Sequence, residues 1–192
     1  MILETRLIAA VAAAWIVWGP HVVVAQTKPA PARPAAAKPA AAAPTIVLET
    51  VKGTIEIETY PEDAPKTVAR ILELIKKNFY NGLRFHRIEK HLVQVGDPTS
   101  RDMSREASWG RTGSGTSIGA AEITKRRRHV VGAVAMAHSG DPKFADSQFY
   151  IVKRTVTELD GKYTVFGRVT QGLDVVAKLE KADILKRASV KP

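Results

Sequence analysis

From residue 45 onward, short apolar runs alternate with polar or glycine-containing stretches, which is the pattern of a protein built mainly of strands. Residues 45–50 and 53–60 are rich in β-branched side chains and are joined across a short turn, Val51–Gly53. They predict a β-hairpin. Further short strands are predicted at residues 83–88, 92–95, 130–137, 148–152 and 164–169.

Two segments have the apolar spacing of helices instead. In residues 66–80 the apolar side chains recur at near-helical intervals. Asp63 is expected to cap this helix, Pro65 to lie in its first turn, and Asn81–Gly82 to end it. A second helix is predicted at residues 173–181. Many short strands with only two helices favour an antiparallel barrel or sandwich over a parallel sheet.

The N-terminus has the order of a secretory signal. Arg6 is followed by twelve apolar residues from Leu7 to Trp18, a Gly19–Pro20 break and small residues up to Ala25. The apolar run is shorter than the roughly 20 residues that a membrane-spanning helix needs. We therefore expect residues 1–25 to be a signal peptide, cut after Ala25; an uncleaved N-terminal anchor is the alternative.

Residues 26–44 are dominated by proline and alanine. From Thr27 to Pro44 there are five Pro and nine Ala among 18 residues. Repeated proline prevents a continuous helix, and there is no large apolar side chain whose burial could offset the entropy of ordering. We expect a disordered linker that tethers a folded domain over residues 45–192.

The absence of cysteine and the net charge limit which kinds of site and partner the chain can have. The chain has no cysteine, which excludes disulfides, thiolate nucleophiles and cysteine-based metal sites. The formal net charge of +10 suggests an anionic partner such as nucleic acid. The densest cluster, Lys125–Arg128, has no interleaved aromatic side chains and is more typical of a solvated loop. We expect no nucleic-acid partner.

Five segments carry a family resemblance. They are Phe85–Ile88, Gln94–Asp97, Ala135–Ala137, Ser147–Ile151 and Leu159–Val169. In this order and spacing the chain closely resembles the cyclophilin family of peptidyl-prolyl cis-trans isomerases. The resemblance implies a mainly β fold, a closed eight-stranded antiparallel barrel capped by two α-helices. It also implies an enzyme that needs no cofactor and no metal.

The chemistry of this family asks for few residue types. Rotation about the bond before proline is opposed by about 18–20 kcal/mol, because the nitrogen shares its lone pair with the carbonyl. Twisting localises that lone pair on the nitrogen, so a fixed donor there gains strength only in the twisted state. The resemblance assigns this donor to Arg87, with Gln94 orienting the substrate. It assigns substrate binding to His86, His91, Leu92, Ala137, His138, Gln148, Tyr150, Leu159 and Tyr163.

Strand alternation places several of these side chains. In residues 83–88, Arg87 is expected to share a face with Leu83 and Phe85. In residues 92–95, Leu92 and Gln94 share a face. In the following strand, Gln148 and Tyr150 share a face, and Phe149 points to the core. Residue type alone would make Leu92 and Leu159 ordinary core residues; only the resemblance favours an apolar cup for proline.

The sequence departs from the family at several places. His91 stands where the family usually has a phenylalanine of the cup, in a loop one residue shorter; a slipped alignment could place Leu92 there. Val95 replaces a glycine, His138 replaces an asparagine, and Glu158 replaces a tryptophan common in cyclosporin-binding members. We expect weak cyclosporin affinity with activity retained.

Other functions are less consistent with the pattern. The five histidines lack the spacing of a helical ligand pair, and no G-x-S-x-G elbow marks a hydrolase, although Ser114 lies in a similar glycine-rich stretch. The main rival is a catalytically weak module of the same fold that binds proline-containing peptides. We expect a monomer in the periplasm or secreted medium, with no transmembrane span in its mature form, acting on exported proline-containing polypeptides.

Overall fold

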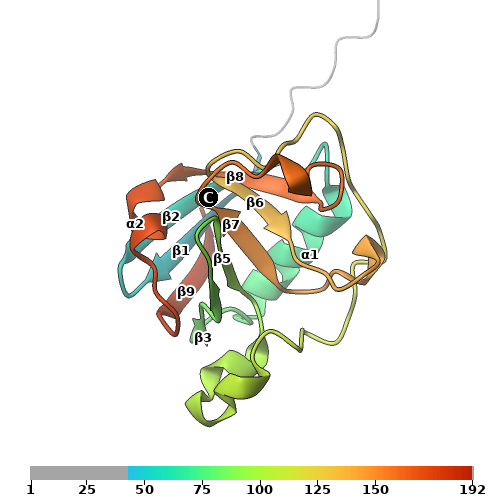
Figure 1. The fold of residues 1–192 in the computed structure, drawn as a ribbon. Coiled ribbons are helices and arrows are strands. Elements are labelled where there is room, and N and C mark those ends of the chain that lie inside the picture. Colours follow the sequence, from blue (N-terminus) through green and yellow to red (C-terminus); the bar gives the residue numbers. More distant parts are fainter. Residues whose placement is uncertain (1–42, 192) are drawn as a thin grey trace, which may run out of the picture. The chain divides into compact units, whose positions relative to one another are not determined.

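One antiparallel sheet dominates the fold. The computed structural model describes residues 43–191, so the signal peptide and most of the predicted linker lie outside the described residues. The strands in this region are β1 (Thr45–Thr50), β2 (Gly53–Thr59), β3 (Leu83–Arg84), β4 (Arg87–Ile88), β5 (Leu92–Val95), β6 (Ala133–Met136), β7 (Phe149–Val152), β8 (Val165–Gln171) and β9 (Ile184–Lys191). They pair in the order β3-β9-β1-β2-β8-β6-β7-β5-β4 (Figure 1).

The two edges of the sheet come close together. Only Phe85 and His86 separate β3 from β4 along the chain. The Phe85 N–H donates to Asp183 O at 2.9 Å on one side of this join, and the His86 N–H donates to Gln94 O at 3.2 Å on the other. Among the described residues no ladder pairs β3 with β4. The sheet is therefore curled but open.

These findings correct the expected barrel. The predicted strand count of eight was wrong, because the described region has nine strands, and closure is not confirmed. The last strand, β9, was missed because exposed Lys186 and Arg187 stand next to each other and interrupt the alternation of apolar and polar residues. The strand predicted over residues 83–88 is in fact two short strands. Arg87 is exposed and does not share the buried face of Leu83 and Phe85.

Both predicted helices are present but shorter. They are α1 (Pro65–Lys76) and α2 (Leu173–Lys178). The predicted cap of α1 was wrong: Asp63 bonds Arg127 and Arg126 instead. At the start of α1, where backbone N–H groups have no partner within the helix, those of Lys66 and Thr67 donate to Glu122, at 2.9 and 2.8 Å. A carboxylate far along the chain therefore satisfies the start of α1.

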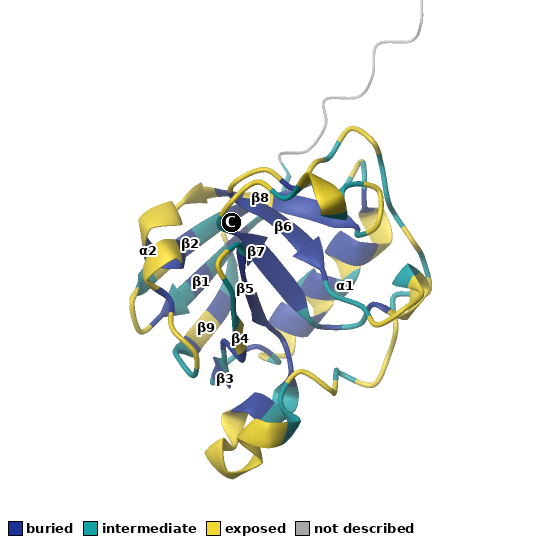
Figure 2. Ribbon diagram, in the orientation of Figure 1, coloured by how far each residue is buried: buried dark blue, intermediate teal, exposed yellow. Residues whose placement is uncertain are grey.

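Two apolar clusters lie on opposite faces of the sheet. The larger packs between the sheet and the helices and contains Phe149, as expected, with Tyr80 and Phe166 in edge-to-face contact with it. The smaller contains Leu92, Ala133, Ala135, Tyr150, Val152 and Val165, with Ala137, Leu159 and Tyr163 packed against it. Figure 2 shows β5, β6 and β7 buried along their length. These strands therefore have apolar cover on both faces.

Gly96 lets two site-bearing segments approach each other. It follows β5 with φ +114°, a conformation that favours glycine. A Cβ at this position would lie 2.6 Å from the Cα of Gln148 and would also collide with Ser147 O. The close approach brings the end of β5 against the start of β7.

In the described part of the chain, no helix combines the length and apolar character needed to cross a bilayer.

Candidate active site

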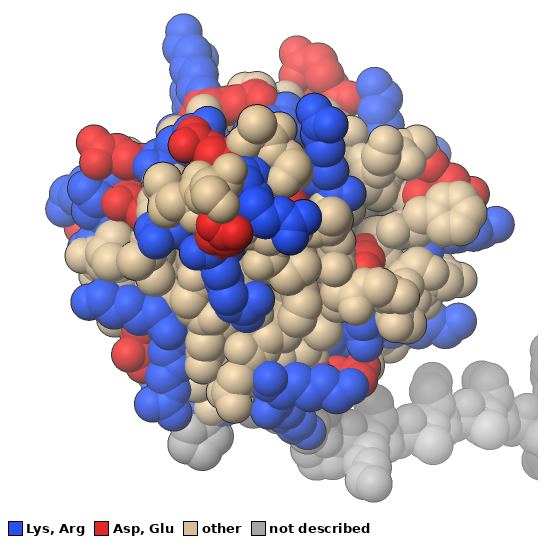
Figure 3. Space-filling view, turned by 90° about the horizontal axis from the view of Figure 1, so that it is seen from below, with Lys and Arg blue, Asp and Glu red and all other residues tan. Residues whose placement is uncertain are grey.

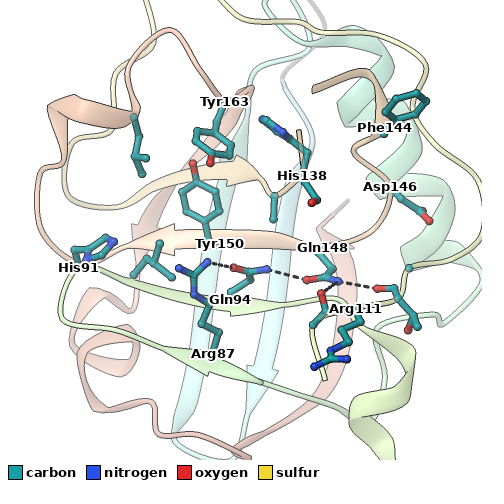
Figure 4. Close-up of a pocket in the computed structure, with 17 residues that line it drawn as sticks. Arg87, His91, Gln94, Arg111, His138, Phe144, Asp146, Gln148, Tyr150 and Tyr163 are labelled. Carbon is teal, nitrogen blue, oxygen red and sulfur yellow. Dashed lines mark hydrogen bonds between the residues drawn. The ribbon is translucent and has the colours of Figure 1, made fainter. Parts of the chain in front are cut away.

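A pocket of about 450 Å³ opens over β5 and β7. Figure 4 draws the seventeen residues that line it. They are Arg87, His91, Leu92, Gln94, Gly110, Arg111, Thr112, Gly113, Ala137, His138, Ser139, Phe144, Asp146, Gln148, Tyr150, Leu159 and Tyr163. Except for His86, every site residue named from the sequence lines this one pocket.

A chain of polar side chains runs along one wall. Arg87 and Gln94 are cross-strand partners, and the Arg87 Nη1 donates to Gln94 Oε1 at 3.2 Å. Gln94 Nε2 donates to Gln148 Oε1 at 2.8 Å, and Gln148 Nε2 donates to the carbonyls of Thr112 and Gly110 at 2.7 and 3.0 Å. Figure 4 shows these bonds as one continuous line. Each side chain therefore fixes the orientation of the next.

Glu89 holds the other side of the guanidinium. The Arg87 Nε donates to Glu89 Oε1 at 2.6 Å, and the Nη2 also contacts this oxygen. His91 Nε2 lies 3.1 Å from the second oxygen of Glu89. About half of the Arg87 side chain is exposed, at 52%. The guanidinium is thus oriented from two sides while part of it still faces the pocket.

An apolar cup lies beside the guanidinium. Leu92 and Gln94 both line the pocket from β5, and Gln148 and Tyr150 line it from the β7 segment, so the predicted shared faces are confirmed. Leu92 and Tyr150 belong to the smaller apolar cluster, with Leu159 packed against it. These three residues therefore belong to the apolar core and line the pocket as well. The rings of Tyr150 and Tyr163 meet edge to face, 5.8 Å apart.

The opposite wall is a loop held by a buried aspartate. Asp97 accepts hydrogen bonds from the backbone and hydroxyl of Thr99, from the N–H of Gly110, and from both groups of Thr112. Burial acts to raise the pKa of Asp97, but the bonds from Thr112 and Thr99 outweigh it, so that the pKa lies below its usual value. Asp97 therefore fixes the loop whose carbonyls accept hydrogen bonds from Gln148.

His86 lies behind the pocket wall and does not line the pocket. Its side chain is buried, and within the described residues neither ring nitrogen has a hydrogen-bond partner. A Cβ on Gly110 would lie 3.2 Å from its Cδ2, so the ring supports Gly110 from beneath. Burial lowers its pKa, although Asp97 acts in the opposite direction. The expectation that His86 binds substrate directly is therefore not supported by its position.

Several lining residues were not anticipated. Arg111, Ser139 and Asp146 stand in loops, and Phe144 ends a short 3-10 helix (Pro142–Phe144), so the pattern of apolar residues held no signal for them. Phe144 is 69% exposed, an unusual degree for a phenylalanine. His138 lies over Tyr163, with ring centroids 4.4 Å apart, and its Nε2 contacts Lys162 O at 3.1 Å.

Ser114 does not belong to a hydrolytic triad. Its hydroxyl donates to Asp146 and accepts from Arg70 Nη2, so it is bound between a carboxylate and a guanidinium, with no histidine against it. Among residues 43–191 no group of three or more His, Cys, Asp or Glu side chains is arranged to hold a metal ion. The pocket instead combines an oriented cation, amide side chains and an apolar cup.

This pocket lies on a curled antiparallel sheet that also carries two helices. The sequence profile described as "cyclophilin type peptidyl-prolyl cis-trans isomerase/CLD" matches residues 45–192. This chain therefore belongs to the cyclophilin family of peptidyl-prolyl cis-trans isomerases.

Individual relatives agree with this family. "Peptidyl-prolyl cis-trans isomerase 10" of Caenorhabditis elegans is 38% identical over 137 residues, covering 71% of this chain and 81% of the relative. A "probable peptidyl-prolyl cis-trans isomerase" of Brucella abortus is 37% identical over 151 residues, covering 77% and 76%.

Solved structures share the fold. The cyclophilin AquaCyp293 from Hirschia baltica aligns with a TM-score of 0.63 and 25% identity, covering 76% of this chain and 73% of its own. A cyclophilin-type isomerase of Cryptosporidium parvum, crystallised in the presence of the dipeptide Ala-Pro, aligns with a TM-score of 0.67 and 23% identity, covering 77% and 99%.

Proposed function

We propose that this cyclophilin-type isomerase accelerates rotation of X-Pro bonds in exported polypeptides, with Arg87 as the donor to the twisted amide. The observation that carries the proposal is the bonded series from Arg87 through Gln94 to Gln148 beside an apolar cup. The cup would take the proline ring and exclude water from it. The Ala-Pro dipeptide used with the Cryptosporidium relative supports a proline ligand for this kind of pocket.

Arg87 supplies what the reaction needs. As the C–N bond twists, its nitrogen becomes pyramidal and regains a lone pair, to which a guanidinium N–H can donate. No bond breaks, so no acid, base or nucleophile is required. Gln94 acts as an orienting group for Arg87 and for the substrate carbonyl. Glu89 limits the movement of the guanidinium, so that less reorganisation is needed when the amide twists.

The test compares the wild type with Arg87→Ala in a cis-trans assay on an X-Pro peptide. We expect kcat/KM to fall about 10²–10³-fold, as for loss of one transition-state donor. Arg187→Ala, which removes an exposed arginine on β9, is the control and should leave kcat/KM unchanged. If wild type is no faster than Arg87→Ala, Arg87 is not the donor.

A second candidate is a module that binds proline-containing peptides and catalyses poorly. The contact of Glu89 with two nitrogen atoms of Arg87 favours it, because the carboxylate offsets part of the cationic field. Peptide affinity, measured by calorimetry on the wild type and on Arg87→Ala, separates the two candidate functions. A wild type that binds peptide but does not accelerate isomerisation would favour the module.

Export and a monomeric state complete the proposal. The signal-like residues 1–25 support a periplasmic or secreted enzyme that works on proline steps in newly exported chains, which take tens of seconds unaided. Cell fractionation with intact-mass measurement should find a mature chain that starts after Ala25. A cytosolic full-length chain would contradict export. Sedimentation should give the mass of one chain.

A further inference from the structure

A buried histidine lies directly behind the pocket. His129 precedes β6, and its side chain is fully buried, with 0% exposed. Its Nδ1 lies 3.0 Å from Asp160 Oδ1, and its Nε2 lies 2.9 Å from the hydroxyl of Tyr150. The rings of His129 and Tyr150 are stacked, with centroids 6.0 Å apart. The three side chains form one hydrogen-bonded series, which we call the Asp160–His129–Tyr150 relay.

The direction of each hydrogen bond in the relay follows from the charge of Asp160. Partial burial acts against that charge, but bonds from the His129 N–H and from Arg128 Nε lower the pKa of Asp160 to about 2. An ionised carboxylate only accepts, so His129 Nδ1 must carry a proton. Burial lowers the pKa of His129, which keeps the ring neutral and leaves Nε2 as an acceptor. Tyr150 therefore donates its hydroxyl proton to Nε2.

The relay fixes two walls of the cup at once. Tyr150 lines the pocket, and its hydroxyl is held by His129. Asp160 directly follows Leu159, the second wall, and also bonds the backbone N–H of His129. The ionised carboxylate of Asp160 is thus bonded to His129 directly and to Tyr150 through His129. His91 also lines the pocket, but its Nε2 lies against Glu89, so Tyr150 and Leu159 belong to the apolar part of the lining.

We propose that the Asp160–His129–Tyr150 relay sets the shape of the proline cup, with His129 as a positioning residue that never touches the substrate. This inference rests on the proposed function of the same pocket. It assigns to His129 and Asp160 an effect on ligand binding through Tyr150 and Leu159. The twisting step, which belongs to Arg87, should be little affected.

The first test is Tyr150→Phe, which keeps the ring and removes the donated proton. We expect KM to rise roughly tenfold with kcat nearly unchanged, because loss of one buried hydrogen bond lets the ring move in the cup. Tyr80→Phe is the matched control. It also removes a buried tyrosine hydrogen bond, from the hydroxyl to Ser147 O at 2.9 Å, but Tyr80 packs in the larger core cluster. Its KM should equal that of the wild type.

A conservative pair of variants tests His129 itself. His129→Gln keeps an acceptor near Tyr150, whereas His129→Leu removes it. We expect Leu to raise KM at least as much as Tyr150→Phe, and Gln to restore part of the affinity. Equal KM values for wild type, Tyr150→Phe and His129→Leu would overturn the proposal.

Nuclear magnetic resonance of the wild type gives an answer that does not depend on folded variants. Nitrogen-15 shifts of the His129 ring should show a protonated Nδ1 and a bare Nε2 near neutral pH. A ring protonated at Nε2 only would overturn the relay. If the wild type itself has no isomerase activity, the proposed function fails, whereas an active wild type with the wrong tautomer or unchanged KM values removes only the relay.

Discussion

The site depends on how single side chains bond their neighbours across strands. Gln94 and Glu89 bond the guanidinium of Arg87 and restrict its movement. In the proposed role of Arg87, this orientation would lower the reorganisation that a freely moving cation needs when the amide twists. His91 makes its contact with the same Glu89, although it stands where the family usually has an aromatic wall. Because position 91 is a histidine, the apolar lining of the pocket comes from other residues, such as Leu92 and Tyr150.

We predict that Leu92, and not His91, carries the contact expected at the family's phenylalanine position. Leu92 is only 4% exposed and belongs to the apolar cluster under the pocket, whereas the His91 side chain is 37% exposed. Leu92→Ala should therefore raise KM for an X-Pro peptide severalfold, and His91→Ala should change it little. Circular dichroism should first show that both variants are folded. A larger loss for His91→Ala would assign the contact to His91 instead.

At the scale of elements, the pocket is made where strands end and loops begin. β5 and the β7 segment supply one wall, and the loop from Asp97 to Thr112 supplies another. The segments that follow β6 and precede β8 line the rest. This loop has two short 3-10 helices, Pro98–Arg101 and Met103–Ser108, and extends from the sheet at the bottom of Figure 1. Its ends are held by one carboxylate, that of Asp97. The shape of this wall therefore depends on a charge.

We predict that Asp97→Asn destabilises the fold at neutral pH by about 2 kcal/mol, because several bonds to a charged acceptor are weakened. The pKa of Asp97 is lowered in the folded state, so its stabilising effect is present above the unfolded value of about 3.9 and is lost as the pH falls through the folded value. Urea unfolding from pH 7 to pH 2.5 should show the gap between wild type and variant closing at acid pH. Asp102→Asn, on the exposed part of the loop, should cost much less. A gap that is constant with pH would contradict this account.

At the scale of the whole molecule, the densest basic run, Arg126–Arg128, is paired with acidic side chains. Arg126 and Arg127 pair with Asp63, Arg127 also pairs with Glu62, and Arg128 pairs with Asp160. The guanidinium of Arg127 lies over the ring of Tyr60, with its Cζ 3.4 Å from the ring centroid. On the face in Figure 3, acidic side chains stand between basic ones. The run is therefore an anchored loop, and its charge gives no support to a nucleic-acid partner.

We predict that residues 43–192 fold and isomerise X-Pro bonds without the first 42 residues. All residues that line the pocket lie in this region, and β1 pairs with β2 and β9 along its whole length. Pro44 must be kept, since its carbonyl accepts from both the N–H and the hydroxyl of Thr59. The truncated chain should match the full chain in kcat/KM and in urea midpoint. A clear loss of either would show that the N-terminal segment contributes to the domain.

Local pattern accounts for part of the fold. The hairpin of β1 and β2, strands β5 to β8 and both helices follow from periodicity, because each buries one face or stripe against its neighbours. β9 and the break at Phe85–His86 do not, since they depend on pairing with distant residues. The cap of α1 was missed for the same reason: its carboxylate comes from Glu122.

The sequence by itself determined the family and the pocket residues that lie in or beside the family motifs, because motif order and strand alternation are read along the chain. It did not give loop residues such as Arg111 and Asp146. Only the tertiary structure decided how the pocket residues are held. Glu89 against Arg87, Asp97 against the loop, and the Asp160–His129–Tyr150 relay are bonds across folded segments. A hydrogen bond forms between groups within about 3 Å, and packing of the curled sheet sets that distance. The sequence names the groups, and the fold chooses their partners.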